Sequence, residues 1–213
     1  MSRAVYAGFG RLLAEDLPAF AADVEALAGL QGAVFLDPED GLSPVLLAML
    51  LRRAWPSARV ILPLVARDAN RTALLGAART AEALGADGLL LLSGRLDPAR
   101  VAQTVYEVDP QQLLGVLRES GVVLPCWVSS RCATAAERAR VESLGRAGAA
   151  CCVVPWSSED AGDACVVRPP VYSVAESDWA AGRLPPGEGD LLLHVTPGRG
   201  AAAAAVVEVG GLS

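Results

Sequence analysis

The sequence predicts an α/β fold, a (β/α)8 TIM-like barrel, on three observations. Short apolar runs alternate with helical segments through residue 156, and repeated units of this kind form either a barrel or a doubly wound sheet. The chain has 213 residues, and a full barrel usually needs about 200–250. Gly8-Phe-Gly10 is too poor a match to the glycine fingerprint of a dinucleotide-binding sheet. We therefore expect one barrel domain over residues 1–213, trimmed or irregular in its last two units.

The strands and helices are predicted in turn from apolar spacing and from start and stop signals. The expected strands are residues 4–9, 32–36, 60–65, 89–92, 122–129 and 151–154. The expected helices are residues 17–30, 43–55, 71–84, 109–120 and 134–146. Ser43-Pro44 and Asp109-Pro110 are a capping residue followed by proline in the first turn, and Thr134 with Glu137 forms a capping-box pattern.

The regular alternation ends after Pro155. Residues 165–172 have the composition of a strand, which Pro169-Pro170 is expected to end. Residues 175–181 predict a short helix, and residues 191–195 predict a strand. The tail over residues 198–207, which contains five consecutive alanines, is compatible with either a helix or an edge strand. These weaker signals are the reason for expecting shortened final units.

Composition excludes several classes of function. The net charge is −6, and all 18 basic residues are arginine, whereas a general nucleic-acid binder needs a basic surplus. A chain without lysine also cannot form a Schiff base through its side chains. The apolar run Val45–Leu51 ends at Arg52, far short of the roughly 20 residues of a membrane span. The N-terminus does not resemble a signal peptide, so we expect a cytoplasmic protein with no membrane or nucleic-acid partner.

The cysteines and the single histidine predict packing and not metal binding. The five cysteines are an odd number, and none has the C-x-x-C spacing of a structural zinc site. We expect them to act as small buried apolar residues, and we expect no metal. His194, in an apolar run, is expected to be a packed strand residue.

Polar residues follow two neighbouring predicted strands and form the candidate binding site. Arg67, Asp68 and Asn70 come after the third strand, where they could bind a ligand or instead cap the next helix. After the fourth strand, Gly94 is followed by Arg95, which suits an anion at a barrel mouth or is a solvated loop residue.

Three aromatic residues extend this candidate site. Tyr106 could stack on a flat ring or simply cover the rim of the barrel. Trp127 and Trp156, at the ends of the fifth and sixth strands, could form walls of a substrate site or fill the core.

The segment Val65-Ala-Arg-Asp-Ala-Asn-Arg71 and the helix and strand up to Gly94 resemble the methylenetetrahydrofolate reductase family. The order and spacing of Tyr106, Asp109 and the Ala-Gly-Ala entry before Cys151 are also similar to that family. The resemblance implies a (β/α)8 barrel of folate (one-carbon) metabolism that binds FAD. It implies hydride transfer from NAD(P)H to methylenetetrahydrofolate, with Arg67, Asp68, Asn70, Gly94, Arg95 and Tyr106 binding cofactor.

The departures from that family leave two alternatives open. Arg95 replaces an aspartate near the flavin, Pro155 replaces a folate-binding glutamine, and Leu144 replaces a lysine that contacts FAD. The first alternative is a non-catalytic relative that acts as a partner or regulatory subunit of another metabolic enzyme. The second is a barrel enzyme for a different anionic small molecule. An incompletely closed barrel would expose sheet edge, so we also expect a homo- or hetero-oligomer.

Overall fold

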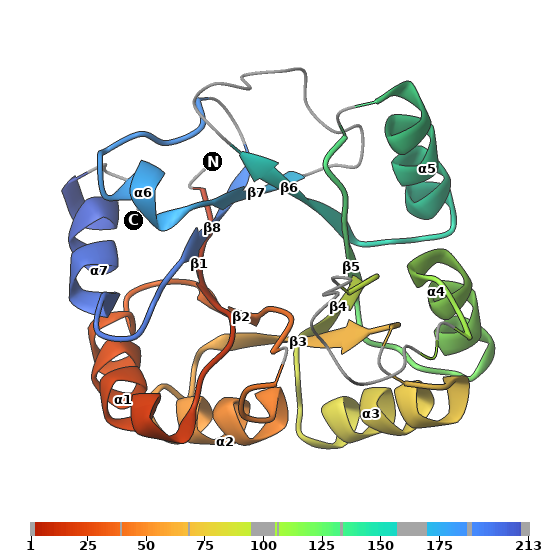
Figure 1. Cartoon of the computed structure of the whole chain (residues 1–213), viewed down its shortest axis with the longest axis horizontal. Helices are drawn as coiled ribbons and strands as arrows, with labels where there is room; N and C mark the ends of the chain where they lie inside the picture. The colour runs from red at the N-terminus through yellow and green to blue at the C-terminus, as the bar shows by residue number, and fades with distance from the viewer. Residues whose placement is uncertain are drawn as a thin grey trace.

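Eight parallel strands close into a barrel, which confirms the predicted (β/α)8 fold (Figure 1). The computed structural model describes residues 3–38, 40–67, 69–94, 105, 107–132, 134–156, 170–186 and 189–209. Each strand pairs with the next one, and β1 pairs with β8 to complete the ring. The strands are β1 (Val5–Phe9), β2 (Gly32–Phe35), β3 (Arg59–Val65), β4 (Gly88–Leu92), β5 (Cys126–Ser129), β6 (Cys151–Trp156), β7 (Pro170–Val174) and β8 (Asp190–His194).

The helices form an outer ring around the strands, as Figure 1 shows. They are α1 (Leu17–Ala26), α2 (Pro44–Ala54), α3 (Arg71–Ala83), α4 (Pro110–Glu119), α5 (Ala135–Arg146), α6 (Glu176–Trp179) and α7 (Gly200–Val209), with a short 3-10 helix (Ala14–Asp16) before α1. The predicted irregularity of the last units falls on a helix, because α6 has only 4 residues, while β7 and β8 have 5 each.

Three expectations from the sequence need correction. Two concern the end of the chain, and the third concerns the closure of the barrel. Pro170 begins β7 instead of ending a strand, because a proline at the first position removes no hydrogen bond from within the ladder. The tail forms helix α7, so the edge-strand alternative is wrong. The barrel is closed, so the exposed sheet edge that we expected from an open barrel does not exist.

The inside of the barrel is a packed core of side chains. Tyr6 of β1 and Trp127 of β5 stand on opposite sides of the ring, yet their ring centroids lie 5.3 Å apart, edge to face. They can meet only across the lumen, so the cluster that contains them is the interior layer. Its buried members are Tyr6, Val34, Ile61, Leu90, Trp127, Cys151, Val153, Val171 and Leu192.

The interior layer shows which face of the barrel wall each remaining strand residue occupies. Side chains alternate between the two faces of a strand, so residues two positions further along also face the lumen. The intervening residues form a second, larger core between strands and helices, which includes Phe9, Leu62 and Leu91. Burying each such side chain stabilises the fold by about 1.5–3 kcal/mol.

Helices begin where the sequence predicts because their capping side chains bind the first free amides. The Asp109 carboxylate accepts hydrogen bonds from the backbone N–H of Gln111 and Gln112, at 2.7 Å and 2.8 Å. Thr134 accepts from the Glu137 N–H at 3.1 Å, which confirms the capping box. These caps set where α4 and α5 begin, and therefore which of their residues reach the barrel mouth.

A buried carboxylate joins the two ends of the chain. Asp23 of α1, 3% exposed, accepts hydrogen bonds from the backbone N–H of Gly198 and Gly200, at 2.8 Å and 2.6 Å. A Cβ at Gly200 would come within 2.7 Å of the Asp23 side chain, so only glycine fits there. The carboxylate satisfies amides at the start of α7 and holds the last helix against the first.

Candidate functional site

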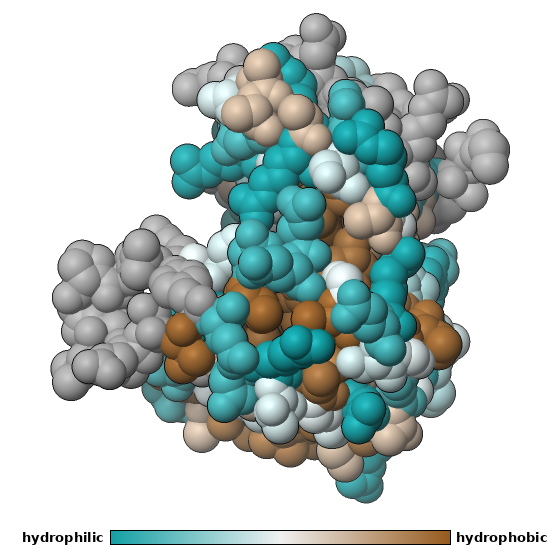
Figure 2. All heavy atoms as spheres, turned by 90° about the vertical axis from the view of Figure 1, so that its right-hand side faces the viewer, coloured by the Kyte–Doolittle hydropathy of each residue, from teal (hydrophilic) through white to brown (hydrophobic). Residues whose placement is uncertain are grey.

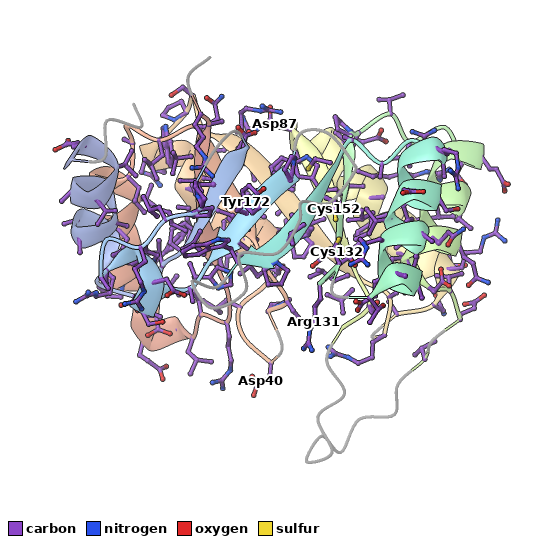
Figure 3. The ribbon with its side chains drawn as sticks, turned by 90° about the horizontal axis from the view of Figure 1, so that it is seen from above. Asp40, Asp87, Arg131, Cys132, Cys152 and Tyr172 are labelled. Atoms are coloured by element: carbon purple, nitrogen blue, oxygen red, sulfur yellow. The ribbon has the colours of Figure 1, made fainter. Side chains whose placement is uncertain are left out.

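The candidate site lies at the carboxyl ends of the strands. Figure 3 shows Arg131, which follows β5, and Asp40 at one end of the barrel, and Asp87, which precedes β4, at the other end. Residues two positions beyond the interior layer face this mouth: Gly8, Leu36, Pro63, Leu92, Ser129, Pro155, Ser173 and His194. Polar side chains therefore first appear in the lumen at this level, above a largely apolar interior layer.

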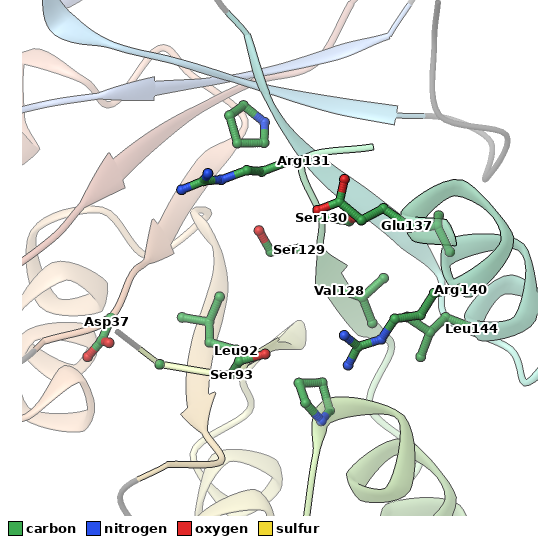
Figure 4. A pocket seen from close by; sticks show the side chains of 14 residues that line it. Asp37, Leu92, Ser93, Val128, Ser129, Ser130, Arg131, Glu137, Arg140 and Leu144 are labelled. Atoms are coloured by element: carbon green, nitrogen blue, oxygen red, sulfur yellow. The ribbon is translucent and has the colours of Figure 1, made fainter. Parts of the chain in front are cut away.

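A cavity of about 500 Å³ opens beside this mouth, between β4, β5 and α5 (Figure 4). Its lining combines serine hydroxyls, two arginines, two acidic residues and an apolar wall. The lining residues are Asp37, Leu92, Ser93, Gly94, Pro110, Val128, Ser129, Ser130, Arg131, Glu137, Arg140, Val141, Leu144 and Pro155. A volume of this size is within the range of small-molecule sites, roughly 300–1,000 Å³.

Two arginines give this cavity its charge. Figure 4 shows the Arg140 guanidinium reaching from α5 toward Val128, and the Arg131 side chain extending across the mouth from the end of β5. Within the described part of the chain, neither side chain makes a hydrogen bond or an ion pair. The Glu137 carboxylate, by contrast, accepts a hydrogen bond from the Thr134 N–H at 3.0 Å. The guanidinium donors are therefore available to a ligand.

The loop that carries Arg131 has a constrained backbone. Cys132 has a φ of +53°, the single positive φ of a non-glycine residue among the described ones. Its N–H donates to Ser130 Oγ at 3.3 Å, and its carbonyl accepts from the Arg138 guanidinium at 3.1 Å. Such a conformation costs about 1–3 kcal/mol and persists only when its surroundings impose it. This turn holds Arg131 at the mouth.

A third arginine is buried beneath the rim. Arg67, which follows β3, is 1% exposed, and its guanidinium lies 3.5 Å from the Asp37 carboxylate after β2. Gly94, with a φ of +85°, packs against it, because a Cβ there would lie 2.8 Å from the Arg67 Cβ. Arg67, Asp37 and Gly94 therefore form one packed unit that joins the ends of β2, β3 and β4.

A serine and the single histidine meet at the ends of β7 and β8. Ser173 Oγ lies 2.6 Å from His194 Nε2, and both side chains are half-buried. Burial lowers the pKa of His194 below its usual value. The neutral imidazole is therefore favoured near pH 7, and it can accept a proton from the serine hydroxyl. The Trp179 indole N–H donates to the His194 carbonyl at 2.7 Å and fixes the end of β8.

The structure places the predicted site residues in different surroundings. Gly94 lines the cavity, and Arg67 lies buried next to it. Asn70 is exposed and caps α3, accepting a hydrogen bond from the Ala73 N–H at 2.9 Å. Trp127 lies in the interior layer below the mouth, and Trp156 packs against the outer core. Asp68, Arg95 and Tyr106 lie outside the described residues.

Sequence reasoning missed four residues that the structure brings to this end of the barrel. Ser129 and Ser173 each follow an inward-facing residue by two positions, and Arg131 follows Ser129 by the same step. Arg140 shares a face of α5 with Val141 and Leu144, since all three line the cavity. Strand alternation, counted onward from the apolar interior residues, is the signal that could have found the first three.

Four of the five cysteines are buried, which agrees with their expected packing role. They are Cys126, Cys132, Cys151 and Cys152, while Cys165 lies outside the described residues. Burial raises the pKa of Cys126 to about 11, although Arg118 acts in the opposite direction. In the described ranges, no group of three or more histidine, cysteine or acidic residues could hold a metal ion. Across the same ranges, no helix has the length and apolarity to cross a membrane.

Comparison with solved structures shows the same fold in several barrels. The chain aligns over 98% of its length, and 97% of the other chain, with 3-keto-L-gulonate-6-phosphate decarboxylase from Vibrio cholerae, at 9% identity and a TM-score of 0.63. A protein assigned to the dihydrodipicolinate synthase family from Coccidioides immitis aligns over all of this chain and 74% of its own, at 16% identity and a TM-score of 0.61. A Rubisco-like protein from Rhodopseudomonas palustris aligns over 98% of this chain and 63% of its own, at 15% identity and a TM-score of 0.59. The sequence matches no protein-family model and no curated protein. These identities establish the class of fold, a TIM barrel, and nothing finer.

The resemblance to methylenetetrahydrofolate reductases is wrong as an assignment of family and function. The structural neighbours are barrels of other families, and no reductase model matches the sequence. The physical reason lies in what the motif does here. Asn70 caps a helix, and Gly94 makes room for Arg67. A polar strand end and a helix cap recur wherever a strand leads into a helix, so they are poor markers of one family.

Proposed function

We propose that this barrel is an enzyme that acts on a small anionic molecule, a phosphorylated or carboxylated metabolite, at the carboxyl end of its strands. The observation that carries the proposal is the pair of arginines, Arg131 and Arg140, beside a cavity of about 500 Å³ with serine hydroxyls. Guanidinium groups bind phosphate and carboxylate through parallel charge-assisted hydrogen bonds. The carboxyl face is also where TIM barrels hold their active sites.

The charge around the cavity supports an anionic ligand. The whole chain has a net charge of −6, so its general field repels anions. The lining, however, contains two arginines against Asp37 and Glu137, and both carboxylates have partners of their own. The positive charge of Arg131 and Arg140 therefore lies at this cavity without a carboxylate partner among the described residues. Leu92, Val128 and Leu144 offer an apolar wall for the uncharged part of such a ligand.

The experiment is a binding measurement with simple anions. Isothermal titration with inorganic phosphate and with a short dicarboxylate should give saturable binding to the wild-type protein. Arg140→Gln should weaken that binding about tenfold, since a charged hydrogen bond contributes about 1.5–3 kcal/mol. Arg146→Gln is the matched control, because Arg146 is exposed on the same helix and does not line the cavity. Equal affinities for the two variants would refute the proposal.

Of the other expectations from the sequence, some stay untested and one loses its supporting argument. Binding of FAD or NAD(P)H rested on the resemblance and stays untested, as does a cytoplasmic location. The alternative of a non-catalytic relative rested on lost reductase residues, and that argument ends with the family assignment. The anionic barrel enzyme is the alternative that the structural neighbours favour.

Self-association stays a prediction, but its physical reason changes. The barrel has no open edge, so any interface must use side chains on the outside of the helices. Leu46, Met49 and Leu50 of α2 are 39–56% exposed, and Figure 2 shows further apolar side chains between hydrophilic ones on the side that carries α3 to α5. We expect gel filtration at micromolar concentration to give a mass above that of the monomer. A monomeric mass would contradict the prediction.

A further inference from the structure

We propose that Ser173 and His194 form a serine–histidine pair in which Ser173 Oγ attacks the acyl carbon of an anionic ester or thioester. This inference rests on the proposed function, because it names the class of substrate that the anion site would hold. The two side chains come from neighbouring strands, lie at the mouth, and were assigned no role by sequence reasoning.

The first step of the argument is the direction of the two side chains. Ser173 follows Val171 by two positions, and His194 follows Leu192 by two, and both of these apolar residues belong to the interior layer. Ser173 and His194 therefore face the lumen at its carboxyl end. Each is half-buried, so the pair is open to the mouth and not sealed in the core.

The second step is the position of the pair relative to the cavity. Ser173 is the cross-strand partner of Pro155 in the β6–β7 ladder, and Pro155 lines the cavity. Partners in register present their side chains on the same face of the sheet. The hydroxyl is thus one strand away from the part of the lining that Pro155 forms. In this proposal, a substrate whose anionic group binds at the cavity places its acyl carbon at Ser173.

The third step is the state of the histidine. The contact of 2.6 Å joins Ser173 Oγ to Nε2, so the neutral ring can accept the serine proton at that nitrogen. Charged groups on the elements that pack beside β8 are paired elsewhere. Glu176 pairs with Arg199 at 2.9 Å, and Asp178 pairs with Arg183 at 2.9 Å. Burial is accordingly the cause that lowers the His194 pKa, and it keeps the base neutral at physiological pH.

The chemistry balances with water as the co-reactant. Ser173 Oγ forms a bond to the acyl carbon while its proton passes to His194 Nε2. The bond from that carbon to the alcohol or thiol then breaks, and the departing group takes the proton from His194. Water next attacks the acyl-serine and gives one proton to the same nitrogen. The bond from the acyl carbon to Ser173 Oγ then breaks, Oγ takes that proton back from His194, and the carboxylic acid is released. Nothing is oxidised or reduced in the acylation step or in the hydrolysis step.

The experiment is covalent labelling of the intact wild-type protein with a fluorophosphonate, followed by peptide mass mapping. We expect a single adduct on Ser173, formed at a rate that rises with pH and levels off above the pKa of His194, which burial holds below its usual value of about 6.5. His194→Gln should slow labelling at least 100-fold, within the range of a lost general base. Ser177→Ala, at an exposed position of α6, is the matched control and should label as the wild type does.

The outcomes separate this inference from the proposed function. Absence of an adduct on Ser173 in the wild type would overturn the inference, and this result does not depend on how any variant folds. Labelling of His194→Gln at the wild-type rate would overturn it as well, because the histidine would then not be the base. Binding of inorganic phosphate is measured on the same wild-type protein, where it depends on the cavity arginines and not on reaction at Ser173. Failed labelling with retained phosphate binding therefore refutes the pair and leaves the anion site standing.

Discussion

The two ends of the barrel differ in how their polar side chains are used. At the amino end, Asp87 accepts hydrogen bonds from the Val60 N–H and from Arg52, both at 2.8 Å. Arg59 there donates to the Tyr6 hydroxyl at 3.1 Å. At the carboxyl end, Arg131 and Arg140 face a cavity and make no such bond within the described ranges. Matched donors and acceptors stabilise a fold, whereas unmatched donors beside a cavity are available for a ligand.

The largest effect should come from removing both cavity arginines. Arg131→Gln with Arg140→Gln should weaken phosphate binding by about 3–6 kcal/mol, more than 100-fold, since each lost charged hydrogen bond contributes about 1.5–3 kcal/mol. The free energy of unfolding should stay within about 0.5 kcal/mol of the wild type, because neither side chain makes a hydrogen bond or ion pair with the residues that the structure describes. Titration calorimetry and urea unfolding measure the two quantities. A loss of unfolding free energy as large as the loss of binding free energy would show that these arginines stabilise the fold, as the polar side chains of the amino end do.

The next effect tests whether the rim unit at the carboxyl end is structural. Gly94→Ala should lower the free energy of unfolding by about 3 kcal/mol, because it combines a positive φ with a clash against Arg67. Gly182→Ala is the matched control, since Gly182 has a φ of +71° but open space around it. That variant should lose only about 1 kcal/mol. Equal losses in urea unfolding would show that the contact with Arg67 contributes nothing.

A smaller effect is expected at the amino end. Asp87→Ala should cost about 2 kcal/mol of unfolding free energy, mainly because the N–H of buried Val60 loses its acceptor. The ion pair with Arg52 adds little, since both side chains are about one-third exposed. Asp87→Asn keeps an acceptor oxygen and should lose about half as much. Phosphate affinity should be unchanged in both variants. A change in phosphate affinity in either variant would show that the amino end of the barrel influences binding at the carboxyl end.

Local sequence signals predicted most of the fold but little of the candidate site. Apolar runs and the caps at Asp109 and Thr134 placed β1 to β6 and α1 to α5, and the weaker signals near the end placed α6 and β8, because these signals act over a few residues. β7 was misjudged because Pro170 looked like a stop, and that error removed Ser173 from any predicted strand. The meeting of Ser173 with His194 depends on the register between β7 and β8, which the closed ring sets. Arg140 reaches the cavity through the rotational position of α5, which tertiary packing decides.

The smallest effect is a pH dependence that belongs to the carboxyl end alone. Burial holds the pKa of His194 below the value of about 6.5 that the unfolded chain would have. The unfolded state therefore binds more protons between these two values, and stability rises with pH across that window. The contribution is complete above about pH 6.5 and is lost as the pH falls toward the lowered pKa. Unfolding free energies measured from pH 5 to 8 should show this slope in the wild type, while His194→Gln should flatten it. An unchanged slope in the variant would show that other groups cause the pH dependence and that the pKa of His194 is not lowered by folding.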